Sequence, residues 1–224
     1  MSKYRNRLPQ LDGGMFLSDG GLETTLIFHQ GLELRHFASF DLLRTQEGAA
    51  RLRDYYRSYL AIAKGDQRGF ILDSPTWRAN SVWGAKLGYS DAALAAVNRE
   101  AIELMVELRD AYDTERNPVV IGGCIGPRGD GYNPGTTMGA EEAEAYHAVQ
   151  IGTFAETEAD MVAAMTLTYE EEAIGIVRAA KAAGMPVVIS FTLETDGRLP
   201  TGQSLGEAIE AVDHATQAWA AYVM

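Results

Sequence analysis

The stretch "ADMVAAMTLTYEEEAIGIVRAAKAAGMPVVISF", residues 159–191, has the pattern of a strand, a helix and a second strand. It opens with a short apolar run, after which Thr168 and Glu171 have the T-x-x-E spacing of a capping box that begins a helix. Gly184 is placed to end that helix, and Pro186 begins the second apolar run. The stretch therefore predicts a strand–helix–strand unit with parallel strands.

The same alternation continues on both sides of this unit. Apolar runs predict strands at 15–19, 69–74, 118–126 and 220–224, and helical spacing or capping residues predict helices at 45–65, 90–113, 140–158 and 204–219. The strand runs are continuously apolar, as in parallel strands that helices cover. Five strand–helix units and a sixth strand fit a doubly wound sheet or a (β/α)₈ barrel.

Composition narrows the class of protein. The chain has 224 residues, of which 46% are hydrophobic, and 31 acidic against 19 basic residues give a net charge of −12. No basic stripe of a nucleic-acid binder is visible, and no apolar run approaches the ~18 residues that span a bilayer. The basic first ten residues have no signal-peptide core after them. We therefore expect a cytoplasmic protein with small-molecule partners, and the sequence does not indicate an oligomeric state.

Common catalytic motifs are absent or explained otherwise. The chain contains no dinucleotide fingerprint, P-loop or H-E-x-x-H sequence, and its four histidines are scattered. The stretch "GQSLG", residues 202–206, formally matches a G-x-S-x-G nucleophile elbow, but no strand runs directly into it. Ser204 is better explained as the N-cap of a helix, with Glu207 completing a capping box.

Polar residues gather where the predicted strands end, which is the edge that holds ligands in parallel α/β folds. They are Asp19, Gly20 and Gly21; Asp73, Ser74 and Thr76; residues 126–129; Thr166 and Thr168; and Thr192 and Glu194. Loops begin at strand ends in any case, so a single such residue carries little weight. As a set, carboxylates such as Asp19 and Glu194 suit an ammonium group, and Gly20 and Gly21 allow a carboxylate to approach the backbone. The set predicts an amino-acid pocket and leaves the reaction open.

Five stretches together carry a family resemblance. They are "LSDGGLETTL" (17–26), "GFILDSPTWRAN" (69–80), "VVIGGCIGPRGDGY" (119–132), the opening stretch (159–191) and "ETDGRLPTGQSL" (194–205). In this order they resemble the homocysteine S-methyltransferases, which are homocysteine-binding barrels related to betaine–homocysteine methyltransferase. The resemblance implies an α/β fold, a (β/α)₈ TIM barrel, with about the first five and a half units in this chain.

The resemblance also implies a reaction. A zinc ion held by three cysteines would keep the sulfur of homocysteine as a thiolate, which attacks the methyl group of a small donor to give methionine. Asp19, Gly20 and Gly21 match the substrate-binding turn of the family, and Ser74 and Thr76 match its second-strand hydroxyl segment. Alignment by eye places Met165 where members often have a glutamate for the amino group of the substrate, and Glu194 is a possible substitute.

The sequence departs from the family pattern at the zinc ligands as well as at Met165. Its three cysteines come after the sixth strand, whereas this sequence stops at Met224 and has only Cys124, which matches none of them. We therefore expect residues 1–224 to be one homocysteine-binding barrel domain, C-terminally incomplete by about 80 residues. Two alternatives stay open: a metal-independent barrel enzyme that acts on a small amino or carboxylic acid, and a non-catalytic amino-acid-binding relative.

Overall fold

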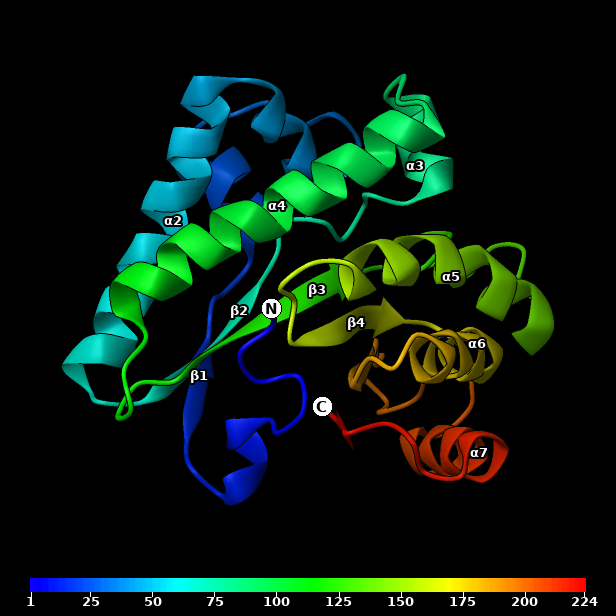
Figure 1. Cartoon of the computed structure of the whole chain (residues 1–224). Coiled ribbons are helices and arrows are strands. Elements are labelled where there is room, and N and C mark those ends of the chain that lie inside the picture. Colours follow the sequence, from blue (N-terminus) through cyan, green and yellow to red (C-terminus); the bar gives the residue numbers. More distant parts are fainter.

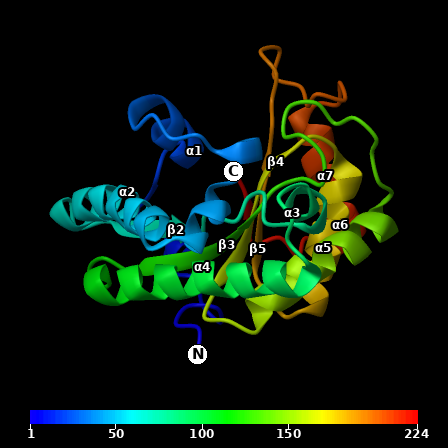
Figure 2. The same cartoon turned by 90° about the horizontal axis from the view of Figure 1, so that it is seen from above.

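Six parallel strands form the centre of the molecule in the computed structural model, which describes residues 1–224 (Figure 1). The strands are β1 (Phe16–Ser18), β2 (Gly69–Asp73), β3 (Val119–Ile125), β4 (Met161–Leu167), β5 (Val187–Phe191) and β6 (Tyr222–Val223). They pair in the order β1-β2-β3-β4-β5-β6. A doubly wound sheet reverses its strand order part-way, and this sheet does not. The sheet curls into a half-barrel, as the view from above also shows (Figure 2).

Helices cover the outer face of this sheet (Figures 1 and 2). They are α2 (Gln46–Gly65), α4 (Asp91–Tyr112), α5 (Ala140–Ala155), α6 (Glu170–Ala182) and α7 (Leu205–Thr216), with the short α1 (Leu22–Thr24) and α3 (Ser81–Lys86) in connections. Short 3-10 and π-helical segments lie between Pro9 and Arg44. The main core of 43 buried apolar residues joins strands and helices. No helix has both the length and the apolar character that crossing a membrane requires.

The N-terminal segment closes the inside of the sheet at the end where its strands begin. Leu8 packs there against inward-facing side chains of four strands, which are Ile71, Val120, Met161 and Val188. Arg5 holds the segment in place by donating hydrogen bonds to the main-chain oxygens of residues 155, 157 and 159. This packing leaves the opposite end, where the strands finish, available for a ligand.

The two predicted capping boxes have different outcomes. The box of Ser204 and Glu207 is confirmed, since each side chain bonds the main-chain N–H of the other. The box of Thr168 and Glu171 is wrong, because α6 begins at Glu170 and its N-cap, Tyr169, makes no side-chain cap. Thr168 is instead buried just beyond β4, and its hydroxyl has no partner. The strand carries this residue into the interior before the helix starts.

Candidate active site

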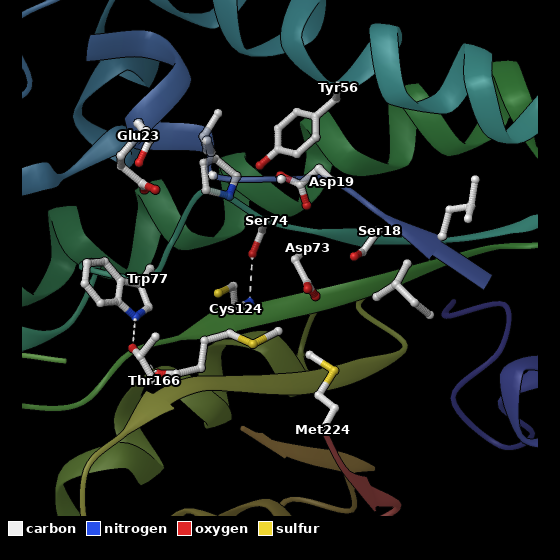
Figure 3. A pocket seen from close by; sticks show the side chains of 18 of the residues that line it. Ser18, Asp19, Glu23, Tyr56, Asp73, Ser74, Trp77, Cys124, Thr166 and Met224 are labelled. Atoms are coloured by element: carbon white, nitrogen blue, oxygen red, sulfur yellow. Dashed lines mark hydrogen bonds between the residues drawn. The ribbon is translucent and has the colours of Figure 1, made fainter. Parts of the chain in front are cut away.

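A cavity of about 1050 Å³ lies where the strands end (Figure 3). Its walls come from β1, β2, β3, β4 and β6, from the connections that follow them, and from Gln10, Leu11 and Gly14 ahead of β1. The charged residues that line it are four acids, Asp19, Glu23, Asp73 and Asp130, and one base, Arg78. A cavity with this balance favours a ligand that carries a positive group.

Asp19 follows β1 and is held in place by a helix. The hydroxyl of Tyr55, on α2, is 2.9 Å from Oδ2 of Asp19 and 3.0 Å from the main-chain oxygen of Gly20. Burial raises the pKa of Asp19 to about 6, although the Tyr55 hydrogen bond acts to lower it. A Cβ on Gly20 would lie 2.9 Å from the hydroxyl of Tyr59, so glycine at residue 20 lets the turn pack against α2 without moving that side chain.

Asp73, the last residue of β2, points into the same cavity (Figure 3). Its Oδ1 atom is buried and has no hydrogen-bond partner. A Cβ on Gly122, its neighbour on β3, would lie only 1.9 Å from this oxygen, so the glycine makes room for the carboxylate. Burial, followed by the charge of Asp19, raises the pKa of Asp73 to about 7.

A chain of hydroxyl groups joins the β2 end to β3. The Oγ atoms of Ser74 and Thr76 are 2.6 Å apart, and Thr76 donates to the main-chain oxygen of Cys124 over 2.7 Å. The N–H of Cys124 donates to Oγ of Ser74 over 3.1 Å, as Figure 3 shows. Burial raises the pKa of the Cys124 thiol well above its ordinary value, so it is not an activated nucleophile.

The end of β4 contains a strained residue beside the cavity. Thr166 has φ of 58°, which is the left-handed region that a β-branched residue rarely adopts, and the pairing with β5 shifts between Ala164 and Leu167. Trp77 donates from Nε1 to Oγ1 of Thr166 over 3.0 Å (Figure 3). This irregularity places both Met165 and Thr166 in the cavity wall.

A second charged group lies at Arg78. Its guanidinium stacks on two tryptophan rings, 4.1 Å from the centroid of Trp77 and 3.7 Å from that of Trp83. It pairs with Asp130 at 3.3 Å. The other acid of the cavity, Glu23, accepts a 2.6 Å hydrogen bond from Ser39, and burial raises its pKa.

The structure brings four of the six predicted site residues to the cavity. Asp19, Gly20, Gly21 and Ser74 line it. Thr76 is fully buried behind Ser74, where its hydroxyl donates a hydrogen bond to the main chain of β3 at Cys124. Glu194 is exposed in the connection after β5 and does not line the cavity.

Sequence reasoning placed Asp73 among the strand-end polar residues, but it gave none of Glu23, Asp73, Arg78 and Asp130 a role in binding. Asp73 was visible as a strand-end acid, and Asp130 lies in the long irregular stretch after β3. Glu23 and Arg78 gave no such signal, because their connections fold back over the cavity only in three dimensions.

Residues 1–224 do not assemble a metal site. No group of three or more histidine, cysteine, aspartate or glutamate side chains in residues 1–224 is arranged to hold one. Cys124 is the single cysteine and is buried. The residues of this chain therefore do not fit a zinc site.

Comparison with known proteins identifies the family. The family model for homocysteine S-methyltransferase matches residues 16–224. This chain belongs to the homocysteine S-methyltransferase family. The match begins at the first residue of β1 and includes every strand of the sheet. No curated protein sequence matches the chain.

Solved structures agree on the fold of this family member. The metallated form of the homocysteine methyltransferase MmuM from Escherichia coli is similar with a TM-score of 0.75 and 20% identity, over 96% of this chain and 76% of that one. The oxidized form is similar with a TM-score of 0.76 and 21% identity, over 95% of this chain and 72% of that one. At this identity the likeness concerns the fold, and the half-barrel is consistent with part of a TIM barrel.

Proposed function

We propose that the protein transfers a methyl group from a small donor to the sulfur of homocysteine and so makes methionine. Membership of the homocysteine S-methyltransferase family carries this proposal. The cavity supports it, because acids and close-approach glycines line the strand ends, where an amino acid can bind. In the reaction a bond forms between the homocysteine sulfur and the methyl carbon while the bond from that carbon to the donor breaks.

Each site residue has a proposed role in binding. Asp19 would accept the ammonium group of homocysteine, and the main chain at Gly20 and Gly21 would approach its carboxylate. Ser74 would offer its hydroxyl from the end of β2, while Thr76 positions Ser74 from behind. The role of Glu194 stays a prediction, since its side chain lies outside the cavity lining.

Three further parts of the proposal concern the complete protein. We propose that the half-barrel is the first part of a (β/α)₈ barrel, which is one domain extending past residue 224. We propose zinc as the metal of the complete protein. The similar structure of MmuM from Escherichia coli is a metallated form. The residues of this chain supply no ligand set of their own. We also propose a cytoplasmic location, with which the single free cysteine is compatible.

The test offers homocysteine to the full-length protein, purified with and without added zinc, together with S-methylmethionine, S-adenosylmethionine or betaine. Methionine is measured by mass spectrometry, and a donor with a labelled methyl group identifies its origin. We expect labelled methionine from at least one donor, and more of it when zinc is present. Binding of methionine with no transfer from any donor would instead indicate a non-catalytic amino-acid-binding relative.

A further inference from the structure

Asp73 is a carboxylate that the protein itself leaves without a partner. Its Oδ1 is buried and accepts no hydrogen bond, although buried charges in proteins are ordinarily paired. The one base of the cavity, Arg78, is taken up by Asp130 and the two tryptophan rings. The charged group that acts on Asp73 is another acid, Asp19, which makes its position less favourable still.

The fold nevertheless makes room for this acid. Glycine at position 122 leaves the space that the carboxylate fills, because a Cβ there would lie 1.9 Å from Oδ1 and the Asp73 side chain would have to move. The next strand presents only the small Ala163 beside Gly122, 3.4 Å from the position of that Cβ. The carboxylate of Asp73 thus fills the space that these two small residues leave, and it lines the same cavity as Asp19 (Figure 3). A cation that reached both carboxylates would be held from two sides.

The fourth strand explains why a second acid is needed. By the resemblance that the sequence shows, Met165 stands where members of the family often have a glutamate for the amino group of the substrate. Met165 lines the cavity, and its thioether cannot pair with a cation as a carboxylate does. Asp73 supplies a carboxylate to the same cavity from β2.

We infer that Asp73, together with Asp19, binds the ammonium group of the amino-acid ligand in place of the missing fourth-strand glutamate. This inference rests on the proposed function, since it assigns a further residue to the same ligand. A primary ammonium group suits the two acids because it has three donors and one positive charge. A metal ion fits less well, since no third ligand completes the pair.

Binding of an ammonium group has a proton signature at this site. The pKa of Asp73 is about 7 and that of Asp19 about 6 in the free protein. A ligand cation lowers both pKa values, so protons leave when it binds. Near pH 6.5 we therefore expect net release of protons on binding, and the part that Asp73 contributes is separated from that of Asp19 and of Glu23, whose pKa burial also raises, by comparing variants.

The test is titration calorimetry near pH 6.5 in two buffers of different ionisation enthalpy, which together give the number of protons released. The ligands are methionine and 4-(methylthio)butanoate, which is methionine without its amino group, so neither ligand needs a metal-activated thiol. The proteins are the wild type, Asp73→Asn, Asp19→Asn and the control Glu210→Gln. Glu210 is an exposed acid on α7 that does not line the cavity. Its substitution changes the net charge by the same amount as Asp73→Asn but leaves the cavity unaltered.

We expect Asp73→Asn to weaken methionine binding about tenfold or more, to leave the analogue unchanged and to reduce proton release. Asp19→Asn should act in the same direction, and Glu210→Gln should match the wild type. Equal effects of Asp73→Asn on both ligands, or no effect on either, would overturn the inference. Gly122→Ala is a second test variant, because it displaces the Asp73 carboxylate without removing it. It should also weaken methionine binding.

Failure of the inference can be told apart from failure of the proposed function. The protein could prefer methionine over 4-(methylthio)butanoate only when Asp73 is present and yet transfer no methyl group. That result would refute the function and support the inference. Normal methyl transfer by Asp73→Asn, with an unchanged KM for homocysteine, would refute the inference and leave the function intact. A wild type that binds neither ligand would overturn the inference, whereas the transfer assay decides the proposed function by itself.

Discussion

The hydroxyl of Tyr55 lies 2.9 Å from Oδ2 of Asp19, so a helix residue fixes the carboxylate at the end of the first strand. The same hydroxyl reaches the main-chain oxygen of Gly20 at 3.0 Å. The orientation of the acid therefore depends on the packing of α2 as well as on the turn. This dependence makes Tyr55 a positioning residue for the proposed ammonium site.

Tyr55→Phe should weaken methionine binding while keeping the fold. A neutral hydrogen bond contributes about 1 kcal/mol, so we expect a loss of roughly fivefold in affinity. The pKa of Asp19 should also rise above about 6, because the hydrogen bond that acts to lower it is gone. Carboxyl-labelled NMR titration measures the pKa, and calorimetry measures the affinity. An unchanged titration midpoint for Asp19 would contradict the positioning role.

Asp73 should make the free protein less stable as the pH rises. Burial raises its pKa from the ordinary 3.8 to about 7, so the folded state binds the proton more tightly than the unfolded state between these values. The contribution of Asp73 to the free energy of unfolding is therefore most favourable below about pH 4, and it is lost as the pH rises through about 7. Asp73→Asn should then raise the free energy of unfolding at pH 7.5 by on the order of 2 kcal/mol, with little change at pH 4. Urea unfolding at the two pH values checks this, and a pH-independent effect would argue against a titrating Asp73.

Gly122→Ala and Gly123→Ala should distinguish an effect on the cavity from an effect on the packing of the core. A Cβ at 122 would meet Asp73, whereas a Cβ at 123 would meet the ring of Phe154 at 2.6 Å. Both changes overpack the interior, and we expect each to lower the free energy of unfolding by about 1–3 kcal/mol. Only the change at 122 should reduce the preference for methionine over 4-(methylthio)butanoate. Loss of that preference in both variants would mean that general distortion is responsible.

Thr166 should tolerate glycine better than valine. Its φ of 58° costs a β-branched residue about 1–3 kcal/mol, and glycine would relieve this cost while losing the hydrogen bond from Trp77. We expect Thr166→Gly to be near neutral in stability and Thr166→Val to be destabilising by roughly 1–2 kcal/mol, because valine keeps the strain and lacks the hydroxyl. Thermal unfolding of the two variants compares them. Equal stability of the two would show that the backbone at 166 relaxes.

Ser204→Ala should affect stability alone. The Ser204 side chain bonds the N–H of Glu207 in the capping box of α7, and loss of such a cap costs about 0.5–2 kcal/mol. Ser204 does not line the cavity, so methionine binding and methyl transfer should be unchanged. Chemical unfolding and a transfer assay with the same preparation check both parts. A loss of activity greater than the loss of folded protein would revive the nucleophile-elbow interpretation.

The strands were predictable because each is a continuous apolar run between turn residues, as Val119–Ile125 and Val187–Phe191 show. Their order in space was not, since local pattern cannot distinguish a sequential sheet from a doubly wound one. The failed capping box at Thr168 has a similar cause. A T-x-x-E spacing is a local signal, whereas tertiary burial at the end of β4 decides where the helix begins.

The candidate site was predictable where the chain turns at a strand end, as at Asp19, Gly20 and Gly21. The position of the Asp73 carboxylate over Gly122 depends on the register between β2 and β3, which the sequence does not state. The contributions of Glu23 and Arg78 depend on how two connections fold over the cavity. These residues become meaningful only when their partners from distant segments are known.

The docking of Leu8 among β2, β3, β4 and β5 sets an order of events during synthesis. Leu8 leaves the ribosome among the first residues, yet its last partner, Val188, is made 180 residues later. At about 5–20 residues per second, the N-terminal segment waits roughly 10–40 s before its binding place exists. Until then its apolar side chain is exposed and available to chaperones, so the first part of the chain to be made is among the last to reach its native place.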